Sequence, residues 1–338
     1  MRLAGLRPKV ACPIISARPC GWYNCLAANF PILPAMSPTD SIKLVFLAAI
    51  WGASFIFLRV AVPEVGPLLT ALLRVSLAGV ALLGFATMTD VQMNWRHNAK
   101  SYALVGLFAT SLPFSCFSFA SLYLPAAYSA LLNSTAPLFG ALFSVLWLAE
   151  RMTPRKLSGL ALGVTGVGVL VGAGALVLDA KVLLAAAACL LAAGCYAVSS
   201  IIVKKTGRPS GASGGIHPIA MATGSMLWGA LIMAPTLPFS LPTATPSATA
   251  IWCVVAMSLL SSAVAQAIFI PLIVKIGPTR AMSVSFLIPL FSMLWAFIFL
   301  HEAVGLSTLL GAAIVLAAMG LVLTARHPEP EDALTVEA

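Results

Sequence analysis

A fourteen-residue stretch occurs twice in this chain and constrains its fold more than any other feature. The first copy reads Pro137-Leu-Phe-Gly-Ala-Leu-Phe-Ser-Val-Leu-Trp-Leu-Ala-Glu150, and the second reads Pro289-Leu-Phe-Ser-Met-Leu-Trp-Ala-Phe-Ile-Phe-Leu-His-Glu302. Six of the fourteen positions are identical, and the same offset aligns Gly159 with Gly311. Because similarity at a fixed offset marks a duplicated structural unit, we expect two copies of one fold packed together.

The composition indicates that most of this duplicated unit lies in a membrane. The mean hydropathy is +1.02, and 9% of the residues are charged, compared with roughly 25% in an ordinary soluble domain. Apolar runs of about 20 residues recur along the chain, each long enough to cross a hydrocarbon core of ~30 Å as a helix. Because these runs are continuous, they favour helices over the short alternating segments of a membrane-spanning barrel.

Ten spans of this kind can be placed, five in each copy of the repeat. The copies correspond to residues 43–175 and 181–324, so the sequence predicts an all-α integral membrane protein with ten transmembrane helices in two five-helix repeats. The predicted spans are 44–62, 67–88, 102–123, 126–148, 156–175, 182–203, 218–239, 249–274, 280–300 and 304–324.

The two ends of the chain lack this apolar character. Residues 1–35 hold five prolines and no helical or strand period, so we expect a disordered cytoplasmic N-terminal tail over residues 1–42. The alternative is a mis-assigned start, with Met36 as the first residue. Residues 325–338 are polar and net acidic, and we expect them to form a cytoplasmic C-terminal tail.

The positive charges predict the orientation of the spans. With a cytoplasmic N-terminus, sixteen of the nineteen Lys and Arg residues fall on the cytoplasmic side, and Lys181 falls alone on the other side. Since short cytoplasmic loops are enriched in Lys and Arg, we expect a bacterial inner-membrane protein with both termini in the cytoplasm. The net charge of +9 is therefore a topology signal and indicates no nucleic-acid partner.

An odd number of spans in each copy predicts that the second copy is inverted relative to the first. Inverted repeats are a recurrent plan of secondary transporters, in which the substrate binds near the middle of the membrane between the two copies.

At this level the chain resembles the EamA family of the drug/metabolite transporter superfamily. The resemblance covers Lys43 to Thr324. It rests on Trp51-Gly-Ala-Ser-Phe55, on Arg74 in the second span, and on the two Pro-Leu-Phe to Glu stretches with the Gly-rich spans that follow them. It implies a transporter of small metabolites, often amino acids or their derivatives and often outward, with a cavity between the repeats.

The second copy departs from this family pattern at two places. Gly194-Cys-Tyr196 stands where Trp51-Gly52 would be expected to recur, and Ser225 stands opposite Arg74. The resemblance does not identify the substrate.

Arg74 is the most informative single residue. It lies about seven residues into its span, or ~10 Å below the outer boundary, where a charge is costly. All ten acidic residues fall in tails, loops or helix ends. One hypothesis is that Arg74 receives an anionic group of the substrate, because its planar fork of donors suits a carboxylate. The alternative is that it binds backbone carbonyls or extends toward Glu64.

Prolines inside two predicted spans indicate a second candidate region. Pro137 and Pro289 each leave a carbonyl one turn earlier without its helical partner, which is tolerated only against protein or water. Asn133, Ser134 and Ser285 are polar residues about one turn from these prolines, so all five are candidates for the wall of a substrate cavity. A plain structural kink is the alternative.

Other candidates come from isolated polar and aromatic residues. Trp51, Tyr196, Gln266 and Trp295 could line the pathway, although lipid-facing or interfacial positions would suit them equally well. Glu150 and Glu302 end their spans, and two interpretations apply to them. They could fix a helix corner by binding free N–H groups, or they could act in gating.

No pattern of catalytic residues, metal ligands or cofactor-binding residues is present, so we predict neither an enzyme nor a cofactor. The leading hypothesis is a transporter that moves a small polar or amphipathic metabolite, foremost an amino acid or a derivative, out of the cell by alternating access between the two inverted repeats. Its partners would be this small molecule and the lipid bilayer. The alternatives are a facilitative importer or exchanger, and a membrane partner protein that transports nothing. The sequence does not indicate the oligomeric state.

Overall fold

The chain is helical wherever regular structure is described. The computed structural model describes residues 37–148, 154–172, 179–206, 215–276, 284–302 and 305–323. They belong to a unit that begins at Met36, and no strand occurs among them. The predicted tails fall outside these ranges except at residues 37–42, where the first helix already begins.

The first copy of the repeat contains helices α2 to α8. Their bounds are α2 Pro38–Val65, α3 Pro67–Met88, α4 Trp95–Gly106, η1 Leu107–Ser111, α5 Leu112–Ala120, α6 Ala126–Asn133, α7 Ala136–Leu148 and α8 Pro154–Gly172. Helix α4, η1 and α5 follow one another without a gap and form one continuous run.

The second copy contains helices α9 to α15. Their bounds are α9 Ala180–Thr206, α10 Pro218–Met233, η2 Ala234–Phe239, α11 Ala248–Ala256, η3 Met257–Val264, α12 Ala265–Ile276, α14 Val284–Leu300 and α15 Leu306–Leu323. Here too, α11, η3 and α12 form one continuous run.

Several of these runs have the length and apolar character of membrane spans. Six of them in the described part of the chain qualify: Pro38–Val65, Pro67–Met88, Trp95–Ala120, Ala180–Val203, Pro218–Phe239 and Ala248–Phe269. Three shorter apolar helices, Leu157–Val169, Leu287–Leu300 and Leu306–Ala318, fall within three further predicted spans. The helical membrane fold is therefore confirmed, while the total of ten spans stays a prediction.

Polar residues at the helix starts supply partners for free backbone N–H groups. Before α2, the Ser37 hydroxyl accepts a bond from Asp40 N at 3.2 Å and donates to the Asp40 carboxylate at 2.7 Å. Before α9, Asp179 Oδ1 accepts from Val182 N at 2.8 Å. Such caps fix where an apolar run becomes helical.

The predicted span 126–148 is divided into two helices. Helix α6 ends at Asn133, Ser134 and Thr135 form a turn, and α7 begins at Ala136. Pro137 is thus in the first turn of α7, where its missing N–H costs no helical bond. The matching Pro289 lies inside α14, which continues through it. The same motif therefore breaks the helix in the first copy and leaves it intact in the second.

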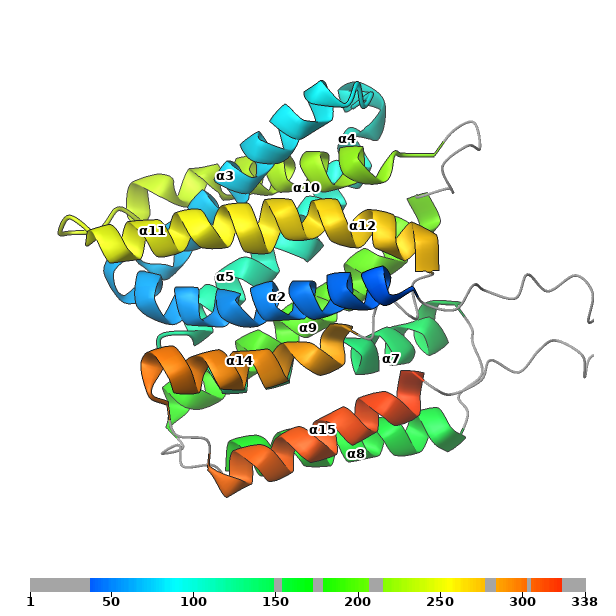
Figure 1. Ribbon diagram of the computed structural model, residues 1–338, viewed down its shortest axis with the longest axis vertical. Coiled ribbons are helices and arrows are strands. Elements are labelled where there is room, and N and C mark those ends of the chain that lie inside the picture. Colours follow the sequence, from blue (N-terminus) through cyan, green and yellow to red (C-terminus); the bar gives the residue numbers. More distant parts are fainter. Residues whose placement is uncertain are drawn as a thin grey trace, which may run out of the picture. The chain divides into compact units, whose positions relative to one another are not determined.

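Helices of one copy pack on helices of the other. Helix α2 packs on α14, and the corresponding pair α9 and α7 also pack on each other, while α8 packs on α15. Figure 1 shows α2 and α14 side by side and running in the same direction. Gly52 permits this approach, because a Cβ atom there would lie 2.8 Å from Phe291 Cβ and 2.9 Å from Ser292 N.

The third predicted span of each copy contains a π-helical segment, η1 in the first and η3 in the second. Pro289 follows Pro137 by 152 positions. The same offset aligns residues 107–111 with residues 259–263, which lie inside η3. Segment η3 packs on α3 and segment η1 packs on α10, so each π segment meets the second helix of the other copy. Inside α-helices, π-helical turns occur frequently at functional sites.

Candidate functional site

Segment η3 is bound to α2 by two hydrogen bonds that meet at Ser261. The indole Nε1 of Trp51 donates to the Ser261 carbonyl at 3.0 Å, and the Ser261 hydroxyl donates to the Ile50 carbonyl at 3.0 Å. The Trp51 ring also contacts Phe269 edge-on, with ring centroids 4.9 Å apart. These contacts hold the π-helical segment of the second copy against the first helix of the first copy.

Arg74, on α3, is bound to the next residue of the same π segment. Its side chain is 6% exposed, and Nε donates to the Ser262 hydroxyl at 2.9 Å. The guanidinium carbon lies 3.9 Å from the centre of the Phe114 ring, within the range of a cation–π interaction. Neither terminal nitrogen makes a hydrogen bond to a residue of the described ranges.

The structure excludes Glu64 as the partner of Arg74. The Glu64 carboxylate instead accepts bonds from the Ser247 backbone N–H at 2.6 Å and from the Ser247 hydroxyl at 2.9 Å. Ser247 in turn caps α11, since its hydroxyl accepts from Ala250 N at 3.2 Å. Arg74 also donates to no backbone carbonyl of the described residues, so its observed partner is the side chain of Ser262.

Aromatic residues from two further helices complete the surroundings of Arg74. Tyr196, on α9, lies near Arg74 and stacks on Phe117 of α5 with ring centroids 6.3 Å apart. Phe114 and Phe117 are three residues apart and therefore share one face of α5. We call Arg74, Phe114, Phe117, Tyr196 and Ser262 the Arg74 cluster. It joins α3, α5, α9 and η3, and so draws on both copies of the repeat.

The break between α6 and α7 forms a second candidate region with buried polar groups. The Asn133 side-chain oxygen is buried and has no hydrogen-bond partner among the described residues. Ser134 is 3% exposed, and its hydroxyl returns to the Leu131 carbonyl at 2.7 Å. Asn133 therefore keeps a buried acceptor available, whereas the hydroxyl of Ser134 is occupied within its own turn.

The candidates of the second copy lie on α12 and α14. Gln266 and Ser285 are half-buried, and Pro289 is buried inside α14. The Trp295 indole donates to the Ala49 carbonyl of α2 at 3.0 Å, and its ring stacks on Phe291. Trp295 therefore helps to hold α14 on α2.

Glu302 fixes a corner that belongs to both copies. One of its carboxylate oxygens pairs with Arg59 Nε at 3.3 Å, and the other accepts from Ala126 N at 3.1 Å, at the start of α6. Arg59 also donates to the Ser121 carbonyl at 2.7 Å. Glu302 therefore binds a free N–H group at the start of α6 and not at the start of the helix that follows it, and its role as a helix corner or gate stays a prediction. Glu150 lies outside the described residues.

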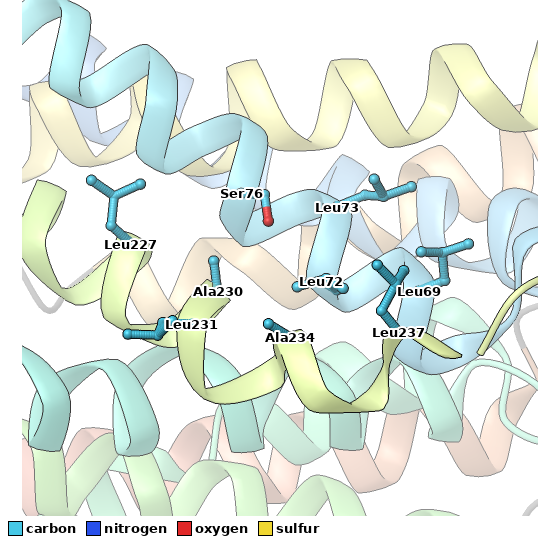
Figure 2. A pocket seen from close by; sticks show the side chains of 9 residues that line it. All are labelled: Leu69, Leu72, Leu73, Ser76, Leu227, Ala230, Leu231, Ala234 and Leu237. Atoms are coloured by element: carbon cyan, nitrogen blue, oxygen red, sulfur yellow. The ribbon is translucent and has the colours of Figure 1, made fainter. Parts of the chain in front are cut away.

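An apolar groove lies between α3 and the α10–η2 region, as Figure 2 shows. Its volume is about 470 Å³, and the only polar side chain that lines it is Ser76. Arg74 is two residues from both Leu72 and Ser76, which in an α-helix places it on the opposite side of α3. The groove is therefore separate from the Arg74 cluster. Its lining residues are Leu69, Leu72, Leu73, Ser76, Leu227, Ala230, Leu231, Ala234 and Leu237.

Sequence reasoning missed four residues of this region: Phe114, Phe117, Ser261 and Ser262. The two serines stand side by side in a predicted span and follow Ser258 by one helical turn, so the available signal was a polar stripe within an apolar run. For Phe114 and Phe117 there was no signal, because the chain holds 17 phenylalanines and most of them fall within predicted spans.

These observations define a membrane protein of several apolar helices, with a duplicated architecture and a buried cation where the two copies meet. The chain belongs to the EamA-like transporter family, whose model matches residues 41–172 and 183–324. The two matches overlap the two predicted repeats, and membership confirms the family that the sequence motifs indicated.

Similar proteins carry transporter names. An uncharacterized transporter of Bacillus subtilis strain 168, YvbV, is 27% identical over 298 residues, which cover 88% of this chain and 95% of the relative. A probable terminal-alkyne amino-acid exporter of Streptantibioticus cattleyicolor is 26% identical over 82% of this chain and 91% of its own length. A probable amino-acid metabolite efflux pump of Escherichia coli K12 is 25% identical over 40% of this chain and 44% of its own length.

A solved crystal structure has the same fold. It aligns with 85% of this chain and 96% of its own, with a TM-score of 0.60 and 20% sequence identity. Family membership thus points to transport of a small molecule across a membrane, and away from enzymatic activity.

Proposed function

We propose that this protein exports a small polar or amphipathic metabolite, an amino acid or one of its derivatives, across a bacterial inner membrane. The observation that carries the proposal is Arg74. A buried guanidinium with both terminal nitrogens unbonded to described residues is costly for a scaffold and suited to a carboxylate. The names of two relatives, an amino-acid exporter and an amino-acid metabolite efflux pump, favour this substrate class and this direction.

The mechanism is alternating access between two inverted five-helix repeats, with both termini in the cytoplasm. In a five-span repeat the first and fourth spans run in opposite directions. Helix α2 is the first span of one copy and α14 the fourth predicted span of the other, and they run side by side in the same direction. That arrangement is expected if the second copy is inverted.

The substrate binds near the middle of the membrane, with its anionic group on Arg74. The buried oxygen of Asn133 at the break between α6 and α7 supports a second polar contact, because discontinuous helices line the binding sites of many transporters. Tyr196, Gln266 and Ser285 are the further candidates for the cavity wall. The corner formed by Glu302 and Arg59 closes the outer side and would have to rearrange if that side opens.

Efflux from cells that express variant proteins tests the proposal. Overexpression in a bacterial host lacking its own copy should raise the extracellular to intracellular ratio of at least one amino-acid-type metabolite. Arg74→Ala should abolish this rise, and Arg74→Lys should reduce it strongly, because lysine keeps the charge and loses the planar fork. Metabolite profiling by mass spectrometry measures both effects.

Lys43→Gln is the matched control, because it removes one positive charge from an exposed position near the start of α2. It should leave efflux unchanged. Membrane fractions must contain equal amounts of each variant. Near-normal efflux by well-expressed Arg74→Ala protein would contradict the proposal.

A further inference from the structure

The positive charge of the Arg74 cluster has no acidic partner in the part of the chain that is described. The carboxylates there lie at helix ends or in loops, and several already have partners. Glu64 binds Ser247, Asp179 caps α9, and Glu302 binds Arg59 and the start of α6. A ligand that enters this cluster therefore meets a net positive site.

The contacts of the Arg74 guanidinium leave the edge with its two terminal nitrogens for a ligand. Nε is occupied by Ser262, and one face is covered by the Phe114 ring at 3.9 Å. The two terminal nitrogens remain, and together they match the two oxygens of one carboxylate. Ser262 thus acts as a positioning residue, because its hydroxyl sets which edge of Arg74 points away from η3.

The aromatic rings of the Arg74 cluster offer little to a second positive charge. The Phe114 face is already taken by the guanidinium, and Phe117 is stacked on Tyr196. An α-ammonium group would sit a few ångströms from Arg74 with no carboxylate of the described residues to balance it. Like charges at that distance repel strongly where water is excluded, and a buried unpaired charge loses its hydration.

We propose that the Arg74 cluster selects organic monoanions that lack a free ammonium group, in preference to zwitterionic amino acids. In the amino-acid series these are N-acylated amino acids and the corresponding desamino acids, which present one carboxylate on an apolar body. The proposal rests on the proposed export function and names the charge class of its substrate.

Binding to the purified full-length protein tests this selection. The probes are phenylalanine, N-acetylphenylalanine, 3-phenylpropionate and phenethylamine, with the matching leucine series as a second side chain. A ligand that binds only the folded state raises the melting temperature in a concentration-dependent manner. The monoanions should reach half-maximal shift at concentrations on the order of tenfold or more below the zwitterion, because of the repulsion from Arg74. The amine should give no shift.

Four variants separate a loss of substrate selection from general damage to the protein. Arg74→Gln keeps hydrogen-bond donors and removes the charge, so the preference for monoanions should disappear. Lys43→Gln removes a charge away from the cluster and should keep the full preference. Ser262→Ala should weaken monoanion binding, and Ser262→Thr, which retains the hydroxyl, should restore it.

Equal or tighter binding of the zwitterion, or a shift produced by the amine, would overturn the proposal. So would the absence of any shift by the carboxylates of both series. None of these results would overturn the export function if efflux in cells still depended on Arg74. Loss of that dependence would overturn the export function itself, so the two failures are distinguishable.

Discussion

Two helix crossings occupy corresponding places in the duplicated chain, and they are filled in different ways. Helix α3 crosses η3, where Arg74 donates to Ser262. Helix α10 crosses η1 and the end of α4, where Gly106 and Gly229 form the contact. The sequence comparison sets Ser225 of α10 opposite Arg74. There the Ser111 hydroxyl donates to the carbonyls of Gly106 and Gly229, at 3.0 Å and 3.2 Å.

The difference shows how a duplicated membrane protein can divide its tasks. Both copies keep the π-helical segment and its contact with the other copy. At the crossing of α10 with η1, glycines let the backbones approach closely and no charged group takes part. At the crossing of α3 with η3 the contact includes the buried cation of Arg74, which we propose binds the substrate. Sequences commonly break packing and solvation rules at functional sites and compensate elsewhere. The tightly packed crossing is the natural place for that compensation.

The packed crossing should tolerate no added volume. A Cβ atom on Gly106 would lie 2.7 Å from the Ser225 carbonyl oxygen and 2.9 Å from Gly229 N, and both of these are backbone atoms. Gly106→Ala should therefore destabilise the protein by about 1–3 kcal/mol or more. A thermal unfolding scan in detergent should show a melting temperature several degrees lower.

Gly84→Ala is the matched control for this prediction. Gly84 is exposed on α3, and nothing lies within 4 Å of a Cβ atom placed there. The substitution should leave the melting temperature unchanged or raise it slightly, since alanine favours a helix over glycine by about 1 kcal/mol. If the two variants have the same melting temperature, the α10–η1 crossing is not the close contact that we describe.

The sequence predicted the helical class because that class depends on long apolar runs, which are local signals. It could not predict the π segments, since they are stabilised by bonds to residues far away in the chain. Ser261 binds Ile50 across 211 positions, and Ser262 binds Arg74 across 188. A local pattern contains no information about which distant helix will face a given turn.

The proline motif shows the same limit within one chain. Pro137 and Pro289 both begin the sequence Pro-Leu-Phe. From this sequence we expected a local disturbance of the helix at each of them. Only Pro137 follows a break, which includes Ser134 and Thr135, while α14 passes through Pro289. Both helices pack on a helix of the other copy, but α14 is also bonded to α2 through the Trp295 indole, which donates to the Ala49 carbonyl.

The Arg74 crossing should lose a moderate amount of stability when its link to α2 is cut. Trp51→Phe removes the bond from Nε1 to the Ser261 carbonyl and keeps an aromatic ring against Phe269. The expected loss is about 1 kcal/mol, the usual net value of one hydrogen bond. The same thermal scan should show a smaller decrease than for Gly106→Ala.

Trp252→Phe is the control for Trp51, because Trp252 is 69% exposed on α11. It should change the melting temperature by less than Trp51→Phe does. An unchanged melting temperature in Trp51→Phe would show that the bond to Ser261 does not help to hold η3 on α2.

The smallest change in stability is expected for a substitution of Ser225. This substitution tests the comparison of the two crossings most directly. Ser225 is 5% exposed, and its hydroxyl donates to the Ala222 carbonyl of its own helix at 3.0 Å. Ser225→Ala loses this local bond and gains helix propensity, so the stability should stay within about 0.5 kcal/mol of the parent protein. Efflux should also be unchanged, in contrast to Arg74→Ala. If Ser225→Ala abolished efflux in a protein that melts normally, both crossings would contact the substrate, and the division between a packed crossing and a binding crossing would be wrong.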